Sequence, residues 1–374
     1  MNSRPSLLYL TPVTPARTGN GLAMRAGAVL MALVRHYDVT LAIVPRYGDR
    51  ADALPEALRA ACRRVVRPGD TPGLDERERF DVVHCFRLAM APVAAPWLDR
   101  AGAWHLDLDE IESESRMAIA ALLAANGDEA RARQEREAAA RARQAEDEAQ
   151  ARFDRVYIAA ADDRDRLLAR EIAGAAVVVL PNTLPDPGFS LSPPPAGGAL
   201  HLLFVGTLGY APNADAVRFF AREVLPILRD GDVATRFVVV GTGSGPDVGR
   251  LAGIPGVTLL GEVPDVVPCY RDAHVALAPL WAGGGTRIKI LEAFALRRPV
   301  VTTTIGIAGI AADHGRHALI ADTPETFAAA CHRLHGDQRL ASHIVDEAFA
   351  LFRRLYTDDV LVPIVAPDPS VSKD

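Results

Sequence analysis

The chain has 374 residues, of which 49% are hydrophobic and 24% are charged, a composition typical of a globular protein that excludes a largely disordered chain. At about 150 residues per domain, this length predicts two domains and excludes a single small scaffold held by disulfides or a metal. The 41 basic and 47 acidic residues leave a net charge of −6, which argues against a general nucleic-acid binder.

The cysteines and the N-terminus bear on where the protein acts. Cys62, Cys85, Cys269 and Cys331 are too far apart in the sequence for a metal knuckle or a Cys-x-x-Cys redox pair, so we expect reduced, buried thiols. Residues 1–15 lack the apolar core of a signal peptide, and no apolar run approaches the roughly 18 residues of a membrane span. We expect a cytoplasmic protein and leave a peripheral contact with a membrane surface open.

Short apolar runs alternate with helical patterns through the first half of the chain. LLYLTPV (7–13) reads as a strand buried on both faces, the helical spacing of 22–36 follows, and VTLAIV (39–44) is a second strand. Further strands are expected near Val82, Trp104, Val156 and Val178. Such βαβ repetition predicts a parallel, doubly wound sheet.

Residues 128–152 are mostly Ala, Arg, Glu and Gln and predict a long helix with charges of both signs. A solvated helix is the favoured interpretation and an interaction arm the alternative. Apolar heptads are missing, so a coiled coil is not expected.

A proline-rich stretch, 181–198, separates the first series of elements from a second. The second series predicts strands near His201, Arg236, Val257, His274 and Pro299, with helices over 214–228 and 286–296. A final helix is expected over 341–355, followed by a poorly ordered tail.

The predicted fold is therefore α/β, with two doubly wound, Rossmann-like domains facing one another across a cleft. We expect an N-terminal, acceptor-side domain over 1–180, a linker over 181–199, and a donor domain over 200–340. A C-terminal helix and tail over 341–374 complete the chain, and this helix could pack back on the N-terminal domain. Ligands of open parallel sheets bind beyond the carboxyl ends of the strands.

The strongest chemical signal is APLWAGGGTRIKILEAFALRRPVV, which runs from a strand through the glycines 283–285 into a helix near Thr286. Glycines allow close approach of the backbone, and the amides of a first helical turn attract anions. Arg287 and Lys289 add two cations, so a diphosphate would fit. Only two of the basic residues are lysines, and Lys289 is the one outside the tail.

Glu292 lies three residues after Lys289, on the same predicted helical face. Its carboxylate could accept hydrogen bonds from a ribose diol. The alternative reading of the whole segment is a glycine-rich turn followed by an exposed Lys–Glu pair.

This segment resembles the donor-binding motif of the glycosyltransferase group 1 family, a retaining class with the two-domain GT-B fold. FVGTLGYAPNADAVRFF (204–220), FVVVGTGSG (237–245) and VTLLGEVPDVVPCYRDAHVALAPL (257–280) keep the order and spacing of that family. The N-terminal half matches more loosely, through PARTGNGLAMRAGAVLMAL (15–33) and DLDEIES (107–113).

The resemblance implies roles for these positions. Arg287 and Lys289 would hold the donor diphosphate and stabilise it as the leaving group, and Glu292 would bind the ribose. The loop formed by Gly261, Glu262 and Val263 would receive the base.

Two departures from the family pattern bear on how the donor is bound. Gly284 stands where the family has a glutamate, eight positions before Glu292, so we expect backbone amides around Gly284, Gly285 and Thr286 to share in binding the donor. The family commonly places Arg and Lys in the first strand-loop of the donor domain, where this sequence has Thr207 and, near Asn213, no lysine, so Arg287 and Lys289 would carry more of the phosphate charge. Gly206 and Thr207 are also expected at the donor.

In the N-terminal half, Gly19, Asn20 and Gly21 precede a helix, and the resemblance places this loop over the donor phosphates and sugar. Arg25, one turn later, could reach the cleft. Ordinary turn glycines are the competing interpretation.

The segment WHLDLDEIES brings His105, Asp107, Asp109, Glu110 and Glu112 to a strand end. Asp109 appears in the place where the family often has a histidine near the reacting sugar, and its carboxylate could orient the acceptor or stabilise positive charge on the sugar. A helix N-terminus enriched in acids is the alternative. The spacing does not define a metal site, and we expect no metal or other cofactor.

These observations predict an enzyme that transfers a sugar from a nucleoside-diphosphate-sugar donor to a hydroxyl-bearing acceptor, a hexosyltransferase type expected to retain the anomeric configuration. No nucleic-acid partner is expected. The alternatives are a nucleoside-diphosphate-sugar epimerase of the same fold and a catalytically silent nucleotide-sugar binding protein.

Overall fold

The computed structural model describes residues 4–46, 53–68, 73–192, 197–231, 233–243 and 245–367. The chain folds into two compact units. The first unit comprises 1–114, 137–185 and 357–374, and the second comprises 115–136 and 186–356. The expected frayed position of Lys373 and the prolines 193–195 of the expected linker lie outside the described residues.

The first unit is built on a parallel sheet in the order β3-β2-β1-β4-β5-β6-β7. Its strands are β1 (Ser6–Thr11), β2 (Asp38–Ile43), β3 (Arg64–Val66), β4 (Val82–Phe86), β5 (Ala103–Asp109), β6 (Arg155–Ile158) and β7 (Ala176–Val179). The apolar runs of the sequence form these strands because both faces of the sheet are covered, so polar alternation is lost.

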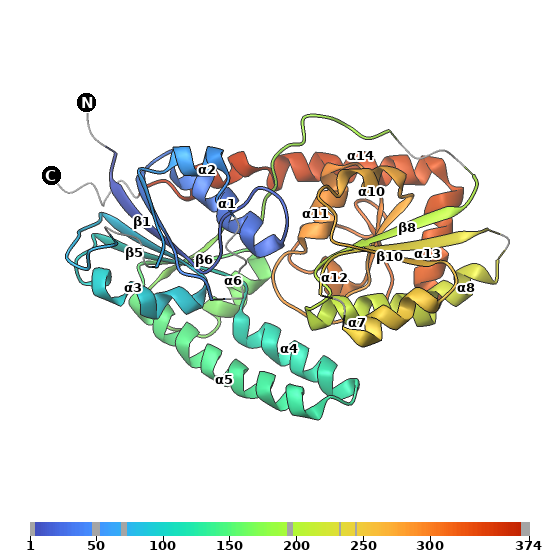
Figure 1. Ribbon diagram of the computed structural model, residues 1–374, viewed down its shortest axis with the longest axis horizontal. Helices are drawn as coiled ribbons and strands as arrows, with labels where there is room; N and C mark the ends of the chain where they lie inside the picture. Colours follow the sequence, from blue (N-terminus) through green and yellow to red (C-terminus); the bar gives the residue numbers. More distant parts are fainter. Residues whose placement is uncertain are drawn as a thin grey trace. The chain divides into compact units, whose positions relative to one another are not determined.

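Helices cover the two faces of this sheet (Figure 1). One face carries α1 (Gly21–Leu33), α2 (Glu56–Ala61) and α15 (Leu361–Ile364), and the other carries α3 (Ala91–Leu98), α5 (Glu129–Arg152) and α6 (Ala161–Leu168). α5 is not solvated all round, because a stripe of small side chains that includes Ala142 and Ala149 packs on the sheet. It runs antiparallel to α4 (Glu112–Ala125), as shown by the pairs Arg116–Glu135 and Ser113–Glu146.

The second unit repeats the same winding, in the order β10-β9-β8-β11-β12-β13. Its strands are β8 (Leu200–Val205), β9 (Thr235–Val240), β10 (Val257–Gly261), β11 (Val275–Ala278), β12 (Val300–Thr302) and β13 (Leu319–Ile320). Its helices are α7 (Ala211–Phe219), α8 (Leu225–Arg229), α9 (Pro246–Gly249), α10 (Val267–Asp272), α11 (Ile288–Ala295), α12 (Thr304–Ile307), α13 (Pro324–Gly336) and α14 (Gln338–Leu355). In each unit the winding reverses direction between two adjacent strands, β1 and β4 or β8 and β11, and ligands of such sheets bind at the carboxyl ends there.

The end of the chain differs from the sequence expectation. We expected a poorly ordered tail after Tyr356, but a 3-10 turn over Asp358–Val360 and α15 follow, with Leu361 and Val365 buried in the core of the first unit. His36 and the carbonyl oxygen of Val362 form a hydrogen bond of 2.9 Å that supports this packing. The long helix α14 instead packs on α11 and α13 of the second unit.

Candidate functional site

In the second unit, the predicted anion loop follows β11 and leads into α11. Gly283 and Gly285 have φ of 106° and 64°, a conformation that favours glycine. A Cβ on Gly283 would lie 2.8 Å from the hydroxyl of Tyr210, so the tyrosine reaches the loop only because that position lacks a side chain. The helix begins at Ile288 rather than near Thr286, because Arg287 is the N-cap and has extended backbone.

Arg287 folds back over this loop. Its guanidinium donates hydrogen bonds to the carbonyl oxygens of Gly283 at 2.9 Å and Gly285 at 2.7 Å, and also to that of Gly284. The cation therefore lies against the glycine loop and is half-buried. Its hydrogen-bond acceptors here are neutral carbonyls.

Lys289 is held beside the loop that follows β8. Its Nζ donates to Oδ1 of Asn213 at 2.7 Å and lies 3.8 Å from the centre of the Phe204 ring. Burial and the nearby Arg287 cation hold the pKa of Lys289 well below its usual value, and Glu292 opposes that shift. Lys289 is thus a desolvated amine at the β8/β11 switch point, and its surroundings disfavour the charged form.

Asn213 is a site residue that the sequence analysis did not identify. Its side-chain nitrogen Nδ2 donates to the carbonyl oxygen of Thr207 at 2.9 Å, and its Oδ1 accepts the hydrogen bond from Lys289. Asn213 thus links α7, the loop after β8 and α11. Gly206 makes this possible, since a Cβ there would lie 2.9 Å from both Lys289 Nζ and Asn213 Nδ2. The only local signal is an amide residue in the first turn of a helix that begins near Pro212.

Glu292 follows one turn after Lys289 and meets Tyr270 of α10. The Tyr270 hydroxyl lies 3.1 Å from Glu292 Oε2 and 3.2 Å from the carbonyl oxygen of Lys289. Burial raises the pKa of Glu292 to about 7, although the Tyr270 hydrogen bond and the Lys289 cation both lower it. The carboxyl group is therefore poised to change protonation near neutral pH.

The loops after β8, β9 and β10 lie against one another at this edge. The amide of Gly206 donates to Val240 O at 2.9 Å, and that of Gly241 donates to Gly261 O at 2.8 Å. A Cβ on Gly241 would lie 1.9 Å from Gly206 O, so this position must be glycine for the loops to touch. The predicted base loop is thus placed at the same edge as the anion loop, with Gly261 and Glu262 exposed and Val263 half-buried.

In the first unit, the Gly19–Gly21 segment forms the N-terminus of α1. Gly19 has a φ of 105°, and the Asn20 side chain caps the helix by accepting from the Ala23 amide at 2.9 Å. The loop follows β1, at the switch point of this sheet. Gly19 and Asn20 are exposed, and Gly21 is half-buried.

Arg25, which we expected near the ligand, is directed into the protein and is 1% exposed. It donates to both oxygens of Asp107, at 2.7 and 3.1 Å, and to Oδ1 of Asn182 at 3.2 Å. A further bond reaches the Leu180 carbonyl oxygen at 3.0 Å. The buried Arg25 therefore holds residues at the carboxyl edge of the sheet in place through these hydrogen bonds.

Asp109 stands at the end of β5 with a φ of 67°. Its Oδ1 accepts from Asn182 Nδ2 at 3.0 Å, and its Oδ2 accepts from Arg87 Nη1 at 3.2 Å. Neither Asn182 nor Arg87 was identified from sequence. The Asp109 side chain is 16% exposed, so one edge of this fixed carboxylate remains accessible.

The other members of this segment take separate places. His105 is buried among Tyr157 and His84 in the sheet core, and burial together with the Arg155 cation lowers its pKa to about 3. Glu110 accepts from Arg87 at 3.0 Å, and Glu112 lies 3.8 Å from the same guanidinium. His105 is therefore a core residue, and the acids gather around Arg87.

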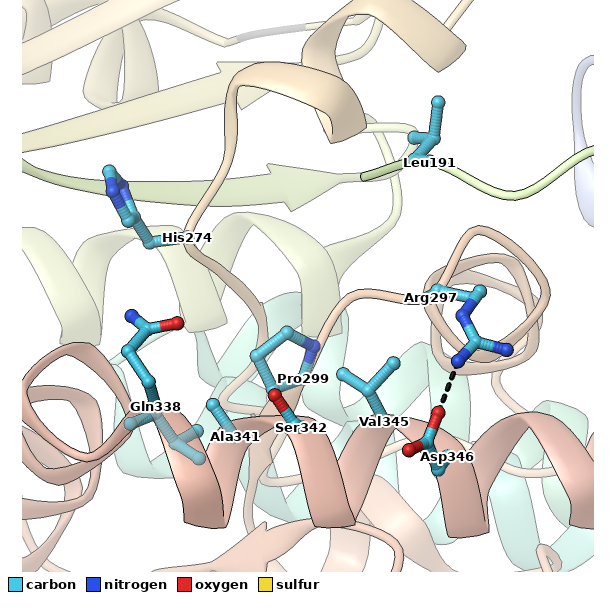
Figure 2. Close-up of a pocket in the computed structure, with 10 residues that line it drawn as sticks. Leu191, His274, Arg297, Pro299, Gln338, Ala341, Ser342, Val345 and Asp346 are labelled. Atoms are coloured by element: carbon cyan, nitrogen blue, oxygen red, sulfur yellow. Dashed lines mark hydrogen bonds and ion pairs between the residues drawn. The ribbon is translucent and has the colours of Figure 1, made fainter. Parts of the chain in front are cut away.

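A separate pocket of about 260 Å³ lies within the second unit at the opposite edge of its sheet. His274 and Pro299, which precede β11 and β12, line it together with Ala341 and Val345 of α14, and an Arg297–Asp346 ion pair closes one side (Figure 2). These are the amino ends of the strands, so the pocket is distinct from the glycine loops described above.

Two searches of the described part of the chain bear on other chemistries. No group of three or more His, Cys, Asp or Glu side chains there is arranged to hold a metal ion. None of the helices there has the length and apolar character needed to cross a membrane.

A family model matches the part of the chain that contains the glycine loops of the second unit. Residues 199–337 match the family model described as Glycosyl transferases group 1. No curated protein sequence matches the chain. The match covers β8 to α13, which includes every second-unit residue of the site described above.

Solved structures similar to the chain extend over nearly all of it. Anabaena Alr3699/HepE in complex with UDP and glucose has a TM-score of 0.67 at 13% identity, covering 96% of this chain and 98% of that one. Sucrose-phosphate synthase from Thermosynechococcus elongatus has a TM-score of 0.68 at 15% identity, with 96% and 97% coverage. A glycosyltransferase from Rickettsia africae has a TM-score of 0.59 at 13% identity, with 96% coverage of both chains. The chain therefore has the GT-B fold of these proteins, and residues 199–337, within its second unit, match the Glycosyl transferases group 1 family model.

Proposed function

We propose that this protein transfers a glycosyl group from a nucleoside-diphosphate-sugar donor to an acceptor hydroxyl, with retention at the anomeric carbon. One observation carries the proposal: Arg287, Lys289 and a glycine loop meet at the β8/β11 switch point of a group 1 domain. Retention rests on the family resemblance.

The diphosphate is assigned to the glycine loop and its two cations. Both cations now face neutral oxygen atoms, and a phosphate would replace these with charged acceptors, which form hydrogen bonds about twice as strong. Thr286 supports this assignment: its hydroxyl is buried and has no hydrogen-bond partner among the described residues. Stabilising the departing diphosphate is then the main source of rate enhancement.

The nucleoside is assigned to the same edge of the sheet. Glu292 would accept hydrogen bonds from the ribose hydroxyls, and the exposed loop of Gly261, Glu262 and Val263 would contact the base. Similar structures are named as complexes with UDP, UDP-glucose, or UDP and glucose, which supports a nucleotide-sugar donor. With Gly284 in place of the family glutamate, amides of the glycine loop would contact the sugar hydroxyls.

The first unit supplies the remaining groups. Gly19, Asn20 and Gly21 would cover the donor, and Asp109 would stabilise positive charge on the reacting sugar. Arg25 acts indirectly in this proposal, because its buried guanidinium holds Asp107 and Asn182 rather than a ligand.

Ligand screening tests the proposal. Thermal unfolding is measured with UDP, GDP, ADP and TDP and with their glucose conjugates, because a ligand that binds the native state raises the unfolding temperature. We expect one nucleoside diphosphate and its sugar conjugate to stabilise the protein, and slow release of free sugar from that conjugate. Failure of every nucleotide to bind would overturn the proposal.

The products distinguish the alternative functions. Conversion of the donor to an epimeric nucleotide sugar without an acceptor would identify an epimerase. Binding without transfer or hydrolysis would identify a silent binding protein. Either result would exclude the transferase.

A further inference from the structure

Two residues with unfavourable backbone conformation contact each other, and one of them carries the proposed catalytic carboxylate. Among the described residues, four that are not glycine have positive φ: Arg87, Asp109, Glu171 and Arg297. Arg87 has a φ of 71° and Asp109 a φ of 67°; Arg87 directly follows β4, and Asp109 ends the neighbouring strand β5. A sparsely populated backbone conformation of this kind costs about 1–3 kcal/mol per residue and persists where the surroundings impose it, commonly at functional sites.

The backbone of Arg87 is fixed by the neighbouring strand. Its amide donates to the carbonyl oxygen of Asp107 at 2.7 Å, and its Nη1 donates to that of Leu108 at 3.1 Å. The side chain is 9% exposed. Arg87 thus reaches across from β4 and lies along the end of β5.

From this position the guanidinium holds Asp109 on one side. Nη1 donates to Asp109 Oδ2 at 3.2 Å, while Asn182 donates to Oδ1 at 3.0 Å. The pairing of β5 with β6 shifts register between Asp107 and Asp109, which turns the Asp109 side chain relative to the strand. The two donors and this bulge together fix the direction of the carboxylate.

The charge balance keeps this site negative. Arg87 contacts three carboxylates, those of Asp109, Glu110 and Glu112, at 3.2, 3.0 and 3.8 Å. Arg25 also lies 3.5 Å from Asp109 and pairs with Asp107, so two guanidinium groups face four carboxylates and do not cancel the local negative charge. A site of this kind suits positive charge developing on a sugar ring.

We propose that Arg87 is a positioning residue, which holds the Asp109 carboxylate in the orientation required for glycosyl transfer without itself touching the substrate. This inference rests on the proposed function, in which Asp109 is the catalytic carboxylate. Displacing a reacting group by about 1 Å can cost roughly 100-fold in rate, so loss of Arg87 should lower turnover strongly.

A double-mutant cycle tests the proposal in the full-length protein. The variants are Arg87→Gln, Asp109→Asn and their combination, and the assay is release of UDP from UDP-glucose, or the corresponding reaction of the donor identified by ligand screening. We expect Arg87→Gln to lower kcat by about 10- to 100-fold. The donor KM should change little, because Arg87 holds Asp109 and is not among the residues assigned to the donor. In the Asp109→Asn background the Arg87 change should have no further effect.

Two further variants separate positioning from folding. Arg87→Gly relieves the left-handed backbone, so it should fold while losing kcat to the same extent. Arg170→Gln is the matched control: Arg170 is a 5% exposed arginine of the first unit that pairs with Glu146 and Asp147, so its loss should lower stability and leave kcat unchanged.

Several outcomes would overturn the inference. Wild-type kcat in Arg87→Gln, or an equal loss of kcat with and without the Asp109 carboxylate, would show that Arg87 does not act through Asp109. Wild-type kcat in Asp109→Asn would show that the Asp109 carboxylate is not catalytic. In these three cases an active wild-type protein would leave the glycosyltransferase proposal standing, whereas absence of any donor binding and turnover in the wild type would overturn both.

Discussion

The carboxyl edges of the two sheets are built differently although the sheets share one winding order. In the first unit, charged side chains satisfy one another: Arg25 and Asp107 are 1% and 0% exposed and form two hydrogen bonds. In the second unit, the corresponding edge consists of glycine backbone, and Arg287 and Lys289 bind neutral carbonyl or amide oxygens.

The first unit's edge is therefore preorganised, because its charged groups are already paired. The second unit's edge is exchangeable, because its neutral hydrogen-bond acceptors can be replaced by those of a ligand. A buried ion pair with good geometry is costly to break, because either partner alone would be a buried, unpaired charge. A cation that faces a neutral oxygen gains by exchanging it for a phosphate oxygen. The first unit is therefore suited to hold a fixed carboxylate, and the second to bind and release a charged ligand.

The largest expected effect is a loss of stability when a substitution breaks the buried ion pair of the first unit's edge. Asp107→Ala removes the carboxylate that accepts two hydrogen bonds from buried Arg25 and leaves only the longer pair with Asp109, at 3.5 Å. Breaking a buried pair in this way costs about 3–5 kcal/mol of unfolding free energy. Chemical denaturation measures it. The matched control is Asp247→Ala, which removes an exposed pair with Arg250 and should cost less than about 1 kcal/mol. Equal losses in the two variants would contradict the comparison.

The next effect concerns the exchangeable edge. Lys289→Ala should raise the activation free energy by about 2–4 kcal/mol and so lower kcat, because it removes an amine placed to stabilise the leaving diphosphate. Burial already disfavours the charged form of Lys289, so the variant should remain folded. Steady-state kinetics and thermal unfolding measure the two quantities, with Arg250→Ala as the control. Undiminished turnover would remove Lys289 from the mechanism.

A smaller effect is expected from pH. The pKa of Glu292 is about 7, so the group is ionised above that pH and protonated below it. If the carboxylate binds the ribose, nucleoside-diphosphate affinity should fall on acidification below pH 7, by up to about 1.4 kcal/mol per pH unit. Calorimetry at pH 6 and pH 8 on wild type and Glu292→Gln tests this, since titration of the phosphates is common to both. Parallel profiles would contradict the ribose assignment.

The smallest effect distinguishes a helix cap from a ligand contact. Asn20→Ala removes the cap of α1 and should cost about 1 kcal/mol of stability. Asn20→Ser keeps a capping oxygen, so it should restore stability. If Asn20 also contacts the donor, Asn20→Ser should still raise the donor KM, and an unchanged KM would limit this residue to capping.

Much of the fold was predictable because buried parallel strands appear in the sequence as continuous apolar runs. The strands near Val82, Trp104, Val156 and Val178 all form, and both sheets are doubly wound. The two- and three-residue strands β13 and β3 were missed, since such short segments show no period. The ordered C-terminal segment was wrongly expected to be a tail, because tertiary contacts with α1 and with residues distant in sequence stabilise it.

The candidate site was predictable where one local segment carries the chemistry, as in the glycine loop with Arg287, Lys289 and Glu292. It was not predictable where partners are distant in sequence. Asn213 and Lys289 are 76 residues apart, and Arg25 and Asp107 are 82 apart. Nothing in a helical or strand period indicates such pairs, so the inward direction of Arg25 and the contribution of Arg87 emerged only from the tertiary structure.

The return of the C-terminal segment to the first unit has a consequence for dissecting the protein. Leu184 pairs with Thr357, Thr183 donates to Asp358 at 2.9 Å, and Arg17, just before the Gly19–Gly21 segment, pairs with the same aspartate at 2.6 Å. A fragment ending near residue 185 would lack Leu361, Val365 and this anchor, and would expose part of the first unit's core. Any attempt to express that unit alone must therefore graft residues 357–367 back onto it, and a nonsense mutation late in the gene would damage the beginning of the protein as well as its end.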